Sequence, residues 1–188
     1  MRLAAMLSFV IPTILATSAI AAEPSAAAKA KADPQLKRQF DELKYEYEID
    51  EDGDYKLVFE VDGKDKRSQL VFVRSPVETY GEHRVREVWS PGYKSATAEF
   101  PAKVANRLLE ASDDSKLGAW VKQNDYAVFV VKIAADASKD ELDDAITAAM
   151  LSADEMEAEL SPGKDDLCEL PRGPLLAAGR HRRHCCGA

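Results

Sequence analysis

Three strand-like segments follow one another between residues 55 and 91. In 55–61 every second residue is apolar and charged residues lie among the others, which is typical of a strand with one buried face. Residues 69–74 are almost continuously apolar, as expected of a central strand, and 83–89 give a third strand pattern that Pro91 and Gly92 should end. Three sequential strands with short connections predict an antiparallel meander.

Helical spacing precedes and follows this meander. Asp33-Pro34 is a favourable helix start, and 100–111 carries an apolar stripe. We expect a second helical piece over 115–123 and a strand over 126–134. Ser138-Lys139-Asp140-Glu141 is a capping box that opens a long helix. The order α-β-β-β-α-β-α predicts a two-layer α+β domain with helices packed on an antiparallel sheet.

The first 21 residues have the pattern of a secretory signal. Arg2 precedes an apolar run that ends in the small residues Ala19-Ile20-Ala21, so we predict cleavage after Ala21. An uncleaved anchor is the alternative, but Pro12 and Thr17 dilute the run. The mature protein is therefore expected to be periplasmic or secreted, without a stable membrane anchor.

The remaining chain divides into three parts by composition. Residues 22–33 are an Ala/Lys-rich spacer, 34–161 form the domain, and 162–188 are a basic, Pro- and Gly-containing tail that we predict to be disordered. Residues 22–167 contain no cysteine, so a disulfide framework, thiol catalysis and Cys-ligated zinc are excluded inside the domain.

The domain is strongly acidic. Residues 22–161 hold 19 Lys and Arg against 30 Asp and Glu, a net charge of −11. Nucleic acids bind proteins largely through neutralisation of phosphates by Lys and Arg. We therefore expect no nucleic-acid partner.

Two clusters suggest metal sites, and both have a simpler explanation. Residues 50–54 place carboxylates at alternate positions, but an EF-hand loop would need Gly where Tyr55 stands and Glu where Val61 stands. An acidic turn is the better interpretation. Residues 181–186 combine two His and two Cys, yet their spacing matches no standard zinc site. We predict no metal ion and no cofactor.

No catalytic residue is predicted. His83 is the one histidine in the domain, and its charged neighbours indicate a solvated strand. Four aromatic residues near a turn are either core or a partner-binding surface: Tyr80, Trp89, Tyr93 and Phe100.

The segments 45–54, 70–73 and 105–109, followed by 128–134 and the acidic helix from Ser138, resemble in order and spacing the YbjN-type domain, a family also described as bacterial sensory transduction regulators. The resemblance covers about residues 34–160. It implies a fold similar to that of type III secretion chaperones, which bind another polypeptide and tend to dimerise. It implies no catalytic residue, because the family has no agreed activity. This sequence departs from the commoner pattern by carrying an export signal, whereas secretion chaperones act in the cytoplasm.

These observations predict an exported, non-enzymatic protein-binding module, chaperone-like or regulatory, whose partner is another envelope protein and which could also form a homodimer. A small-ligand sensor is the main alternative. A hydrolase that uses scattered carboxylates such as Glu48, Glu60 and Glu87 is a weaker one, because it would need two of them paired in a cleft.

Overall fold

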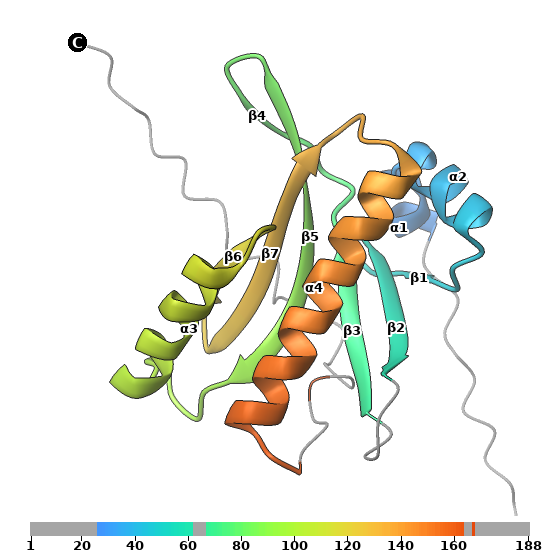
Figure 1. Ribbon diagram of the computed structural model, residues 1–188. Coiled ribbons are helices and arrows are strands. Elements are labelled where there is room, and N and C mark those ends of the chain that lie inside the picture. Colours follow the sequence, from blue (N-terminus) through green and yellow to red (C-terminus); the bar gives the residue numbers. More distant parts are fainter. Residues whose placement is uncertain (1–25, 62–66, 164–166, 168–188) are drawn as a thin grey trace, which may run out of the picture.

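An antiparallel sheet of seven strands forms the centre of the molecule (Figure 1). The computed structural model describes residues 26–61, 67–163 and 167. The strands are β1 (Glu48–Ile49), β2 (Tyr55–Val61), β3 (Arg67–Val73), β4 (Glu78–Tyr80), β5 (His83–Lys94), β6 (Ala119–Gln123) and β7 (Tyr126–Ala134). The helices are α1 (Ala26–Lys31), α2 (Pro34–Leu43), α3 (Ala102–Asp114) and α4 (Lys139–Leu160). The predicted α+β class is confirmed.

The strands are ordered β1-β2-β3-β5-β7-β6, and β4 pairs with the start of β5. The meander predicted over 55–89 is therefore present as β2, β3 and β5, with every ladder antiparallel. The long β5 and β7 pair along nearly their full lengths. In this order β5 and β7 lie near the centre of the sheet, the short β1 and its neighbour β2 lie at one edge, and β6 lies at the other.

Helices cover one face of this sheet, which we call the first face. The orange α4 crosses it diagonally in Figure 1, and its inward residues Leu142 and Ile146 pack against Val71, Val88 and Phe129 from three strands. Leu36 and Phe40 of α2 complete the same cluster. Leu108 of α3 packs beside it with Met156 of α4. Within the described ranges, no helix is long and apolar enough to cross a membrane.

The predicted end of the third strand at Pro91 and Gly92 is wrong. β5 continues to Lys94, with a shift of register between Pro91 and Tyr93. The Pro91 carbonyl accepts a hydrogen bond from the side chain of Gln69 on the β3 side. The missing N–H of Pro91 thus falls where β3 and β5 are no longer paired, so no ladder bond is lost.

The helix predicted over 115–123 is also wrong, because 119–123 is the edge strand β6. Gly118 has a φ of +85° and lies against Phe129 and the Val130 carbonyl, so the chain turns there instead of continuing the helical stripe. Asn124, with φ 56°, then makes the tight connection to β7. Pairing with β7 outweighs the local helical spacing.

Residues 26–31 of the predicted spacer 22–33 belong to the fold. Residues 26–31 form α1, and Ala28 is buried. Gly53, in the turn between β1 and β2, lies so close to α1 that an added Cβ would be 2.6 Å from Lys31 Cβ. The predicted signal and its cleavage site at Ala21 lie outside the described residues.

Candidate functional site

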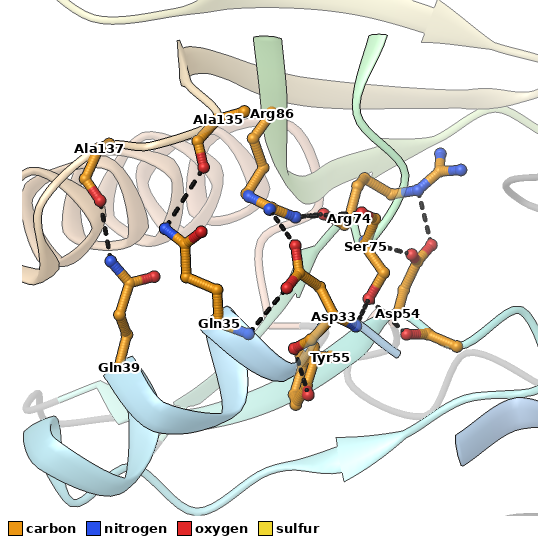
Figure 2. A network of polar contacts seen from close by, with 11 residues as sticks. Asp33, Gln35, Gln39, Asp54, Tyr55, Arg74, Ser75, Arg86, Ala135 and Ala137 are labelled. Carbon is orange, nitrogen blue, oxygen red and sulfur yellow. Dashed lines mark hydrogen bonds and ion pairs between the residues drawn. The ribbon is translucent and has the colours of Figure 1, made fainter. Parts of the chain in front are cut away.

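A network of buried charged groups joins the start of α2 to the sheet (Figure 2). Arg86 of β5 is only 2% exposed. One of its guanidinium nitrogens pairs with the Asp33 carboxylate, and the other donates to the carbonyl oxygens of Arg74 and Ser75, at 2.7 and 3.1 Å. The same carboxylate caps α2 by accepting from the Gln35 N–H at 2.8 Å. One arginine therefore fixes a helix start and a loop together.

The second half of this network is centred on Asp54. Its carboxylate accepts from the Ser75 N–H at 2.7 Å and forms an ion pair with Arg74 Nε at 2.6 Å. Ser75 Oγ donates to the Gly53 carbonyl and accepts from the Asp33 N–H, so the two halves are joined. The guanidinium of Arg74 also lies 4.6 Å from the centre of the Trp89 ring. Through Arg74 the network thus reaches Trp89 on the face of the sheet that α4 does not cover.

The acidic turn at 50–54 is held by its own backbone. The Asp50 carboxylate accepts from the N–H groups of Asp52 and Asp54, at 2.9 and 3.0 Å, which is an Asx-type turn. Nowhere in the described part of the chain do three or more His, Cys, Asp or Glu residues lie together in a way that could hold a metal ion. The carboxylates therefore act as turn acceptors and ion-pair partners.

Burial raises the pKa of Asp54 to about 6, against the opposing effect of Arg74 and of the Ser75 N–H. Asp50 and Asp52, the other acidic groups facing it, raise it further. The unfolded chain has an ordinary Asp54, with a pKa of 3.8. Between these values the folded chain holds a proton that the unfolded chain releases. The contribution of Asp54 to stability is therefore highest below pH 3.8 and declines as the pH rises through 6.

We expect the difference in unfolding free energy between the wild type and Asp54→Asn to fall by about 2 kcal/mol from pH 4 to pH 7, since one pKa unit corresponds to about 1.4 kcal/mol. The asparagine retains an acceptor for the Ser75 N–H but cannot ionise. Urea unfolding at a series of pH values measures this difference. Glu51→Gln, at an exposed position of the same turn, is the control and should follow the wild type in parallel. A difference that does not change with pH would contradict the assignment.

A second cluster of polar groups lies between the C-terminal half of α4 and the sheet. Arg67 of β3 donates from Nε to the Asp154 carboxylate and from Nη2 to the Asp154 carbonyl, at 2.8 and 2.7 Å. The fully buried Gln69 donates from its amide nitrogen to Ser90 Oγ and the Pro91 carbonyl. The contacts of Arg67 attach α4 to β3, and those of Gln69 join β3 to β5, so both residues have a structural role.

The opposite face of the sheet, which we call the second face, is also apolar. Successive side chains of a strand point to opposite faces of a sheet. The strand registers place eight apolar residues on the face that α4 does not cover: Val58, Leu70, Phe72, Trp89, Val121, Tyr126, Val128 and Val130. None of the helix clusters that we describe includes any of these residues. The strands β3 and β7 are therefore apolar on both faces, as the nearly continuous apolar runs in their sequences indicate.

The described groups that cover the second face are few. Leu167, the one described residue beyond 163, is 4% exposed and packs with Leu70 and Trp89. The guanidinium of Arg74 lies over the Trp89 ring. Towards the edges of the sheet, Val58 and Val121 are 54% and 38% exposed. The central side chains of this face are buried, each at most 7% exposed: Leu70, Trp89, Tyr126, Val128 and Val130. Exposed apolar side chains at the margins of such a face are typical of a contact surface for another polypeptide segment.

No known family model and no curated protein matches this chain. Inferences about its function therefore rest on its own residues.

The four aromatic residues predicted as core or partner site do not form one surface. Trp89 is buried on the second face, and Tyr93 and Phe100 contact each other at 5.8 Å between centroids beneath α3. Only Tyr80 is exposed, at 82%, where the β4–β5 hairpin projects beyond the sheet in Figure 1. The aromatic residue type alone does not distinguish core residues from exposed ones, whereas the position of each residue in the fold does.

The other candidate residues also lie apart. His83 is exposed and pairs with Tyr80 across the hairpin. Glu48 pairs with Lys56 at 3.7 Å and Glu87 with Lys132 at 3.2 Å, so these two carboxylates have different partners. Glu60 lies near the far end of β2, opposite Ser68. The cluster at 181–186 lies outside the described residues.

Proposed function

We propose that this protein is an exported, non-enzymatic polypeptide-binding module of the bacterial envelope, of the YbjN type, and that it binds its partner through the second face of the sheet. The observation that carries this proposal is the apolar character of that face. The described helices pack on the first face, whereas the second face carries aromatic and branched side chains from five strands. The resemblance of 34–160 to a family with a chaperone-like fold agrees with this role.

The chemistry of the surface defines the partner. The apolar side chains that the second face exposes are Val58 and Val121 at its margins, whereas Trp89, Val128 and Leu70 at its centre are at most 5% exposed. The surrounding domain has a net charge of −11 over residues 22–161, which favours basic partners and disfavours acidic ones. We therefore expect an envelope polypeptide with an apolar segment flanked by Lys or Arg.

We expect the mature chain, residues 22–188, to retain a stoichiometric partner from envelope extracts, and Val58→Asp or Val121→Asp to bind that partner at least tenfold more weakly. Both valines are exposed at the margins of the second face, so a buried carboxylate would oppose contact there without disturbing the core. A tenfold loss corresponds to about 1.4 kcal/mol. Affinity capture identifies the partner, and titration of the purified proteins measures the loss.

Leu151→Asp is the matched control, because Leu151 is 45% exposed and lies on α4, which covers the first face. It should bind as the wild type does. Equal binding by all three variants would refute the second face as the contact surface. Retention of no partner even after crosslinking would refute the binding-module proposal itself.

A further inference from the structure

The chain changes from one face of the sheet to the other soon after its last helix. Leu160, the final residue of α4, packs with Leu108 and Met156 on the first face. Leu167 belongs to the cluster of the second face, with Leu70 and Trp89. Seven extended residues reach about 24 Å, and packed layers lie about 10 Å apart. The connection between these two leucines is thus long enough to pass around the sheet.

We propose that the C-terminal segment, residues 168–188, docks on the second face of its own molecule, with Leu167 as its first contact. This segment lies outside the described residues. It begins where Leu167 is already seated among the apolar side chains of the second face. An apolar residue held there would keep the residues that follow close to the surface they are to bind.

The length and composition of this segment fit the surface. Its 21 residues include Leu170, Leu175 and Leu176, and then Ala177 and Ala178. In extended form they would span about 70 Å. The distance from β2 across to β6 is about 20 Å, because neighbouring strands lie about 4.8 Å apart. The segment can therefore cross the second face and bring its leucines onto it.

Charge favours the same arrangement. Residues 168–188 carry four Arg and one Glu, whereas residues 22–161 have a net charge of −11. A basic segment is attracted to an acidic domain, and its attachment at Leu167 adds a local concentration in the millimolar range. A free polypeptide must displace this segment before it can bind. That last consequence rests on the proposed function, whereas the docking itself does not.

Paramagnetic broadening of methyl NMR signals tests the docking. A nitroxide is attached to Cys185 of the full mature chain, after replacement of Cys168 and Cys186 by Ser. Because neighbouring residues of one strand point to opposite faces, each strand supplies its own control. We expect the methyl signals of Leu70, Val128 and Val130 to lose most of their intensity. Those of Val71, Val131 and Leu142, on the first face, lie farther from the label and should lose clearly less intensity.

Leu167→Asp in the same labelled chain should restore the second-face signals, while Leu151→Asp should not. Circular dichroism of both variants checks that the domain stays folded. Equal broadening on both faces, or none on either, would overturn the proposal. The same would follow if a spin-labelled chain broadened the second-face signals of a separate isotope-labelled chain, because a second copy would then be the occupant. No external partner is used, so failure here leaves the capture result unaffected.

Discussion

Replacement of Arg86 by Ala is expected to lower the free energy of unfolding by about 3–5 kcal/mol, which is the usual cost of removing one partner from a buried ion pair. Arg86 is 2% exposed and contacts the Asp33 carboxylate and two carbonyl groups. Its loss would leave the partly buried carboxylate of Asp33 without its cation at the start of α2, and two carbonyl groups without their donor. Since small domains have a total stability of about 5–15 kcal/mol, urea unfolding should show a much earlier midpoint.

Arg84→Ala is the control for this variant, because Arg84 lies on the same strand with an exposed side chain. Its effect should stay within about 0.5 kcal/mol. The double variant Arg86→Ala with Asp33→Asn should lose less than the sum of the two single losses, since the neutral amide no longer needs a cation. Additive losses would show that the pair does not act as a unit.

Replacement of Gly118 by Ala is expected to cost about 2–5 kcal/mol, the sum of a left-handed backbone and an overpacked core. Its φ is +85°, and an added Cβ would lie 2.7 Å from both Phe129 Cε1 and the Val130 carbonyl oxygen. The strain would fall on the junction of α3 and β6, and through Phe129 on the core beneath α4. The midpoint of urea unfolding measures it.

Gly81→Ala separates the two causes. Gly81 also has a positive φ, +59°, but its Cβ would meet nothing within 4 Å. This variant should therefore show the backbone cost alone, about 1–2 kcal/mol. If both variants lost the same free energy, close approach at Gly118 would not contribute.

Periodicity predicted most of the central elements. The alternation in 55–61 and the capping box at Ser138 correctly predicted the positions of β2 and α4. It failed at 119–123, where apolar spacing compatible with a helix lies next to β7, whose ladder supplies the hydrogen bonds of a strand. Propensity is a weak guide wherever tertiary pairing competes with it.

The charged network was missed for a different reason. Asp33, Asp54 and Arg86 are distant in sequence, and each taken alone has the appearance of a helix cap, a turn residue or a solvated strand residue. Their association depends on the turn after Ile49 and the loop after Val73 meeting at the start of α2. The signal that was available was Arg86 itself, which falls on the same face of its strand as the buried Val88.

The position of α4 at the end of the chain determines when this protein can fold. Its inward face supplies the cover for β3, β5 and β7, yet it spans residues 139–160 and is synthesised after all of them. A growing chain that stops short of α4 leaves the apolar first face of these strands without its main cover. We therefore expect the native fold to form only once residues 139–160 have been synthesised, when nearly the whole chain is available.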